Sequence, residues 1–263
     1  MLGLCLKLGE SLKGHKPDNF KLRNSEFVAQ KVIFHACSIL FLFRGTSLNG
    51  VPLLDKPTNF VDYASIHVLT RSLLETTWAF HHVFVAPETE DERSFRYYCW
   101  MLAGFVQRQT FPAIVESARQ QFEKDAAKIA EWREELGRTE AFARLRDREK
   151  TKALEGRLWR PPSFKQTAKK FLGSRFGPSI YAYLSSYQHA DALAAVQIGA
   201  HNSYAKQKDA ARASLSLVAI SLSNLVEAYC TLWPGLKLVA NRYPDTQELV
   251  KMYSSFPTFE GIE

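Results

Sequence analysis

The chain lacks paired cysteine motifs, long uninterrupted apolar runs and segments that alternate apolar with polar residues. Its four cysteines are widely spaced and no two form a CxxC pair: Cys5, Cys37, Cys99 and Cys230. This spacing argues against a zinc-finger or disulfide framework. We expect reduced thiols, with Cys37, Cys99 and Cys230 in the core, as is typical of a cytosolic protein. No cofactor and no metal site are expected.

The longest apolar run is Val32–Phe43, and His35 and Ser38 interrupt it. It is shorter than the roughly 20 apolar residues that cross a bilayer as a helix. A buried core helix is therefore favoured over a membrane role, and we expect no membrane partner. The N-terminal segment lacks the basic start and long apolar stretch of a signal peptide, so the expected localisation is cytoplasmic.

The lack of alternation argues against half-buried β-strands, whereas apolar residues recur three and four positions apart along most of the chain. We predict an all-α protein, a multi-helix bundle that forms a single helical domain over residues 1–263. Residues 113–157 are dense in charge of both signs and predict a charged helical hairpin inserted in that domain. The net charge of +7 permits an anionic partner without requiring one.

Capping residues and breakers predict where the helices begin and end. Asn24 or Ser25 is expected to cap the first helix. The expected helices run over about residues 25–44 and 59–85, from 88 to before 112, from 163 to 173, from 177 onward, and over 206–232.

A first polar stripe lies in the expected helix 59–85, which is otherwise poor in charge. Its members His67, Arg71, Glu75 and His82 fall within about one quadrant of a helix. Three interpretations compete. Arg71 and Glu75 form a structural ion pair; or Arg71 binds an anion while His67 or His82 supplies a proton; or Glu75, His82 and a third histidine bind a metal.

A second stripe, Tyr181, Ser185 and His189, has four-residue spacing and shares one helix face. A hydroxyl and an imidazole one turn apart can hydrogen-bond, which is the minimum for an activated nucleophile or a proton relay. The alternative is structural: Ser185 satisfies a backbone carbonyl while His189 caps the helix or pairs with Glu75. No GxSxG motif surrounds Ser185, which argues against a serine hydrolase.

No acidic residue occurs between residues 156 and 190. The same stretch carries six basic residues with aromatic residues between them: Arg157, Arg160, Lys165, Lys169, Lys170 and Arg175. Unbalanced positive charge with aromatic side chains is typical of an RNA-binding surface. The alternative is an ordinary basic helix face.

The two stripes together resemble the all-α, mostly bacterial family named domain of unknown function 5677. Arg71 and Glu75 match its Arg–x–x–x–Glu helix, and Ser185 and His189 match its later S-x-x-x-H helix. The resemblance implies a polar cluster in a helical bundle. A looser similarity is to the helical HEPN ribonucleases, whose catalytic Arg is followed a few residues later by His. Here an equivalent pair would combine Arg71 and His189 from different helices.

We therefore expect Arg71, Glu75, Ser185 and His189 to form one cluster facing a cleft. The first functional hypothesis is metal-independent RNA cleavage, in which Arg71 holds the phosphate and His189 transfers a proton. Analogy of fold suggests a bacterial defence or toxin role. The alternative is a non-catalytic scaffold that binds nucleic acid, a protein partner or a second copy, with the 113–157 hairpin as the contact surface.

Overall fold

The computed structural model describes residues 1–14, 19–49, 52, 56, 58–160, 163–189 and 191–254. Over these residues it contains thirteen α-helices, one π-helical turn and one two-stranded sheet, which confirms the predicted all-α class. The chain divides into two compact units. Unit 1 comprises the described residues of 1–18, 23–78 and 163–263, and unit 2 comprises 19–22 and the described residues of 79–162.

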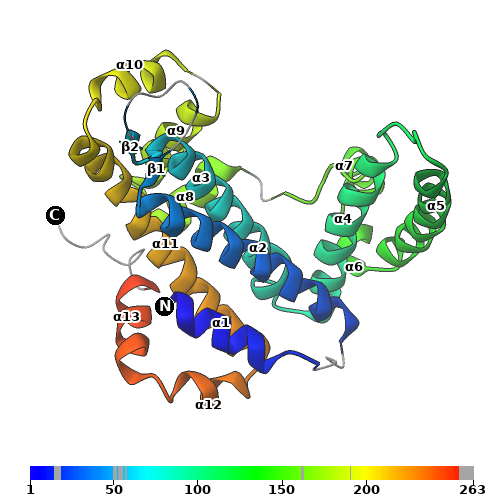
Figure 1. The fold of residues 1–263 in the computed structure, drawn as a ribbon. Helices are drawn as coiled ribbons and strands as arrows, with labels where there is room; N and C mark the ends of the chain where they lie inside the picture. The colour runs from blue at the N-terminus through cyan, green and yellow to red at the C-terminus, as the bar shows by residue number, and fades with distance from the viewer. Residues whose placement is uncertain are drawn as a thin grey trace. The chain divides into compact units, whose positions relative to one another are not determined.

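Unit 1 contains the first and last helices of the chain (Figure 1). Its elements are α1 (Leu2–Ser11), most of α2 (Phe20–Phe43), β1 (Thr46–Leu48), β2 (Thr58–Phe60), α3 (Tyr63–Phe80) as far as Trp78, α8 (Phe164–Leu172), α9 (Gly177–Gln188), α10 (Ala192–Ala200), α11 (Tyr204–Leu232), α12 (Leu236–Ala240) and α13 (Pro244–Ser254). The long helix α11 packs against α1, α12 and α13. These contacts join the first and last described helices in one unit.

The apolar core of unit 1 brings α3 together with helices that follow much later in the chain. Leu74 and Trp78 of α3 pack with buried residues of α8, α9 and α11: Ala168, Leu172, Leu184, Leu217 and Ile220. Aromatic rings surround Trp78, with Phe164, Phe171 and Tyr181 at centroid distances of 5.9 to 6.2 Å. This packing holds the polar positions of α3 beside α9.

The strands β1 and β2 form an antiparallel pair in which Thr46 faces Phe60. The sequence predicted no strand here, because three-residue strands with mostly exposed side chains carry no alternating pattern. The helix predicted over 59–85 therefore begins later, at Tyr63. Its last turn, η1 (His81–Val85), is π-helical.

Helix α2 is less buried than its sequence predicts. It begins at Phe20, so the expected capping positions Asn24 and Ser25 lie inside the helix. Phenylalanines spaced seven residues apart are exposed on it: Phe20, Phe27, Phe34 and Phe41. Cys37 is also exposed, so its predicted core position is wrong, and Cys230 is only partly buried, whereas Cys99 is buried as expected. The prediction of a buried core helix is therefore wrong for the face of α2 that carries these phenylalanines.

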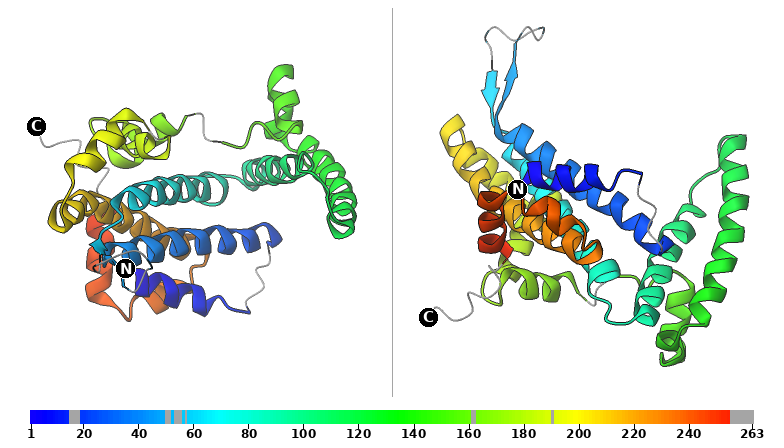
Figure 2. Two further views of the ribbon diagram at one scale, coloured as in Figure 1. Left: turned by 45° about the horizontal axis from the view of Figure 1, so that its top comes forward. Right: turned by 90° about the horizontal axis from the view of Figure 1, so that it is seen from below.

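Unit 2 is built on two packed helices, α4 (Glu90–Arg108) and α5 (Glu116–Gly137), followed by α6 (Glu140–Ala143) and α7 (Asp147–Leu154) (Figure 2). Phe105 packs edge-on against Trp132, with centroids 4.5 Å apart. Arg108 donates two hydrogen bonds to the buried carboxylate of Asp125, at 2.6 and 2.7 Å. The charged stretch 113–157 thus shares a unit with α4. From the sequence, the helix now seen as α4 was instead expected in the main bundle.

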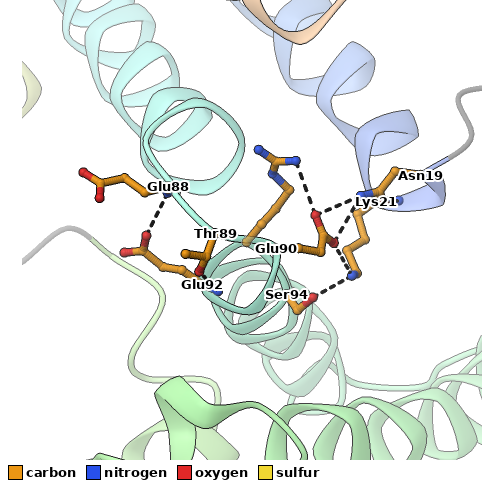
Figure 3. A network of polar contacts seen from close by, with 8 residues as sticks. Asn19, Lys21, Glu88, Thr89, Glu90, Glu92 and Ser94 are labelled. Carbon is orange, nitrogen blue, oxygen red and sulfur yellow. Dashed lines mark hydrogen bonds and ion pairs between the residues drawn. The ribbon is translucent and has the colours of Figure 1, made fainter.

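The start of α2 belongs to unit 2 because polar contacts join it to α4 (Figure 3). Lys21 Nζ donates to Glu90 Oε1 at 2.8 Å and to Ser94 Oγ at 2.6 Å, and Asn19 Nδ2 donates to the same carboxylate. Helix α4 begins at Glu90 because the Thr89 side chain caps it by accepting from the backbone N–H of Glu92. Glu90, in the first turn of α4, thus also binds the N-terminal segment of α2.

Candidate functional site

Arg71 and Glu75 form an ion pair one turn apart on α3. Arg71 Nε donates to Glu75 Oε1 at 2.9 Å, and the two side chains are 13% and 30% exposed. They are the only charged residues of this helix. A half-buried pair on an otherwise uncharged helix costs desolvation, so it requires further polar partners.

Tyr181 of α9 supplies those partners. Its hydroxyl accepts from Arg71 Nη2 at 3.1 Å and donates to Glu75 Oε1 at 2.8 Å, which closes a ring of three hydrogen bonds. The Arg71 guanidinium also lies over the Tyr181 ring, 5.0 Å from its centroid. Burial and the hydrogen bond to Glu75 raise the pKa of Tyr181. The sequence placed Tyr181 on the second stripe but assigned it no role in the site.

His189 completes the cluster. Its Nε2 lies 3.3 Å from Arg71 Nη1. Because a guanidinium only donates, Nε2 is the acceptor and the ring proton resides on Nδ1. His189 is exposed and caps the C-terminal end of α9. The prediction that the segments bearing Arg71 and His189 pack together is confirmed.

Ser185 lies on the same face but does not join the cluster through its hydroxyl. Its Oγ donates to the Tyr181 carbonyl at 2.7 Å. Of the two interpretations of Ser185, the hydrogen bond to His189 is therefore not formed, and the structural alternative, a hydrogen bond to a backbone carbonyl, is confirmed. A hydroxyl donating to the preceding turn is a common arrangement within helices. The geometry gives Ser185 no activating base.

A cleft of about 550 Å³ opens beside the cluster. Tyr181 and His189 form part of its wall. The other lining residues are Lys165, Pro178, Ser179, Ala182, Ser185, Ser186 and Asp191. Lys165 and His189 therefore line one cavity, as does Asp191. Arg71 and Glu75 do not line the cleft and contact it through Tyr181 and His189.

The predicted basic surface is shared between the two units. Lys165, Lys169 and Lys170 lie exposed on α8, a helix that Ser163 caps and Gly173 ends with φ of 86°. Arg175 follows, its guanidinium 5.3 Å from the ring centroid of Phe176. These four residues belong to unit 1, together with the cluster.

The other two residues of the predicted surface, Arg157 and Arg160, belong to unit 2. Arg157 pairs with Glu155. The guanidinium of Arg160 lies 5.3 Å from the ring centroid of Trp159. Only the part of the basic stretch that starts at residue 163 therefore shares a unit with the cluster.

His67 separates from the first stripe and occupies an aromatic pocket of its own. It is 1% exposed. Its Nδ1 lies 2.9 Å from Ser214 Oγ, and its Nε2 lies 3.3 Å from the Tyr183 hydroxyl. Burial lowers the pKa of His67 to about 4. A neutral, doubly hydrogen-bonded His67 is a core residue and not the proton donor considered for an anion site.

His82 also leaves the stripe, because the π-helical turn changes the helical register at its position. It lies in unit 2, where Arg96 Nη1 contacts both its Nδ1 and its carbonyl oxygen, at 3.2 and 2.8 Å. Burial lowers the pKa of His82 to about 4. Among the described residues, no group of three His, Cys, Asp or Glu side chains could bind a metal. The metal interpretation with Glu75 and His82 therefore finds no support in this geometry.

Comparison with models of protein families, with curated proteins and with solved structures finds no match to the chain. The family resemblance of the two stripes therefore stays a prediction.

Proposed function

We propose that unit 1 binds RNA in the cleft beside α9 and cleaves it without a metal ion. The observation that carries the proposal is the contact of Arg71 Nη1 with His189 Nε2 at the wall of a cleft that also receives Lys165. A fixed guanidinium, an imidazole with an unprotonated nitrogen and a lysine are the groups that phosphodiester transfer requires.

The reaction follows from these groups. The 2′-hydroxyl replaces Arg71 Nη1 at His189 Nε2, and Nε2 then takes its proton. The 2′-oxygen bonds to phosphorus, and the bond from phosphorus to the 5′-oxygen breaks. The departing oxygen takes a proton from water, leaving a 2′,3′-cyclic phosphate and a 5′-hydroxyl. Arg71 and Lys165 offset the negative charge that gathers on the phosphate oxygens.

Arg71 retains the capacity for this role. A guanidinium has five N–H groups, and three of those on Arg71 have partners among the described residues. One N–H remains on each terminal nitrogen, and the positive charge of the guanidinium lies directly behind the cleft wall formed by Tyr181 and His189. Glu75 and Tyr181 act as positioning residues, because both hold the guanidinium and neither contacts the proposed reacting atoms.

The alternative is a non-catalytic scaffold, and the ring of Arg71, Glu75 and Tyr181 favours it. Each of the three side chains hydrogen-bonds to the other two, as expected of a structural polar contact that holds α3 and α9 together. In that case removal of His189 leaves any binding unchanged, and the charged hairpin of residues 113–157 is the expected partner contact.

The test is incubation of the purified full chain with labelled RNA, with DNA of the same sequence, and with EDTA present or absent. His201→Ala is a matched control for His189→Ala, because both histidines cap the C-terminal end of a helix in unit 1 and only His189 lines the cleft. Circular dichroism confirms that each variant is folded.

We expect EDTA-resistant cleavage of RNA but not DNA, abolished in His189→Ala and retained in His201→Ala. Cleavage that EDTA stops, or that survives in folded His189→Ala, overturns the catalytic assignment. A folded wild-type chain that cleaves nothing leaves the scaffold as the better account.

A further inference from the structure

Helix α2 carries a straight row of exposed phenylalanines in unit 1. Phe27, Phe34 and Phe41 are 58, 64 and 72% exposed. Seven residues are nearly two full helical turns, so the row drifts by only about 20° per interval. At 1.5 Å per residue the row is roughly 21 Å long. Large aromatic side chains gathered on a surface mark an interaction site more often than single exposed ones do.

We propose that this row, the Phe ridge (Phe27, Phe34 and Phe41), seats unit 1 on the surface of an anionic membrane. This inference departs from the expectation that the chain has no membrane partner. It rests on observations independent of the cleft beside α9.

Charge along α2 identifies the kind of surface. Its single acid, Glu26, is partly buried. The exposed charged residues beside the ridge are Arg23, Lys31 and, just after the helix, Arg44. Aromatic side chains with lysine and arginine beside them are typical of helices that lie in the membrane interface. Anionic headgroups attract each basic residue near the surface, which adds to the burial of the rings.

The spacing of the ridge argues against a helical partner, including a second copy of the chain. A heptad seam needs a second apolar residue three or four positions after each first one. After Phe27 these positions hold the polar Gln30 and Lys31, and after Phe34 they hold Ser38 and only the small side chain of Cys37. A flat lipid surface needs only the single row.

The opposite face of α2 packs in the protein, which argues against the helix crossing a membrane in this fold. By length and composition, α2 and α11 are long and apolar enough to span a bilayer. Yet Val32, Ala36 and Ile39 of α2 are buried in the protein. Only the ridge side is free for lipid. Leu6 of α1, 50% exposed, lines a groove of about 580 Å³ together with Phe34. Glu10, Lys13 and Glu26 also line this groove, so the apolar surface proper is the ridge itself.

The experiment is co-sedimentation of the full chain with phosphatidylcholine vesicles, with and without phosphatidylserine. The test variant is F27S/F34S/F41S. The matched control F111S/I114S/V115S removes three comparably exposed apolar side chains between α4 and α5. A second variant, R23E/K31E/R44E, tests the charge. Circular dichroism checks folding, and size-exclusion chromatography with light scattering reports the oligomeric state.

We expect binding to the phosphatidylserine vesicles that falls at least tenfold in the ridge and charge variants and persists in the control. Absence of binding by the wild type overturns the proposal, as does an equal loss in the control. A wild-type dimer that the ridge variant converts to a monomer, without vesicle binding, assigns the ridge to a second copy and also overturns it.

Discussion

Acidification is expected to destabilise unit 1 through His67. The side chain is 1% exposed and enclosed by aromatic rings, with Tyr183 and Tyr187 at centroid distances of 5.2 and 4.6 Å. Burial lowers its pKa from 6.5 to about 4. Between these values the unfolded chain binds a proton that the folded chain does not. This contribution to stability is complete above pH 6.5 and decreases as the pH falls toward 4.

The size of the effect follows from the two pKa values. The free energy of unfolding decreases by about 2 kcal/mol at pH 5 and by about 3 kcal/mol at pH 4, relative to neutral pH. The pKa of His82 is also lowered by burial, so His82 contributes to the loss of stability at low pH as well. The contribution of His67 is therefore isolated by comparing the wild type with a variant that lacks this histidine. Urea unfolding is measured from pH 7 to pH 5 for the wild type and for His67→Gln.

We expect His67→Gln to be less stable than the wild type at pH 7, because the amide replaces the imidazole poorly between Ser214 and Tyr183. Its loss of stability on going to pH 5 is expected to be smaller by about 2 kcal/mol, since the titrating group is gone. Parallel pH profiles for the two proteins would refute a depressed pKa at His67.

Three further predictions concern single sites. Gly156→Ala is expected to lower the free energy of unfolding by about 2 kcal/mol or more, because φ is 70° and a Cβ would lie 2.8 Å from Ala103 Cα. Gly104→Ala, which has open space around its Cβ position, is the control in urea unfolding. Cys37 is expected to react with a thiol reagent in the native state while Cys99, whose pKa burial raises to about 12, does not; equal rates would contradict the exposure of α2. Tyr181→Phe is expected to cost about 1 to 2 kcal/mol in urea, because it removes one acceptor and one donor of the ring, and an unchanged midpoint would show that the ring adds no stability.

Local signals were sufficient for several helices. Ser163 and Gly173 bound α8 as predicted, because a capping hydroxyl and a glycine with positive φ act within a few residues. Helix α11 ends at Leu232, as the proline and glycine that follow it indicated. Helices α1, α10 and α12 were not predicted, because they are short or lack a clear polar side, and their ends depend on packing.

The candidate site was predictable in part. The four-residue spacing of Arg71 and Glu75 implies an ion pair on any helix, and the pair is present. The contact of Arg71 with His189 was predicted from the scarcity of charged residues around both polar stripes, and it is confirmed. The hydroxyl of Ser185 was misassigned, because a carbonyl one turn back competes for the same proton and spacing does not show which partner wins.

The sequence by itself determined the all-α class and the charged pair on α3, because helical periodicity and pairing four residues apart act on neighbouring residues. The approach of α9 to that pair was expected from the cost of unpaired charge, but it is made by packing between distant segments. Only the tertiary structure decided that Tyr181 closes the ring, that His67 leaves the stripe for an aromatic pocket and that α2 exposes its phenylalanines. Each of these depends on which distant helix covers a given face. That choice is made by packing across more than a hundred residues of sequence, as between His67 and Ser214.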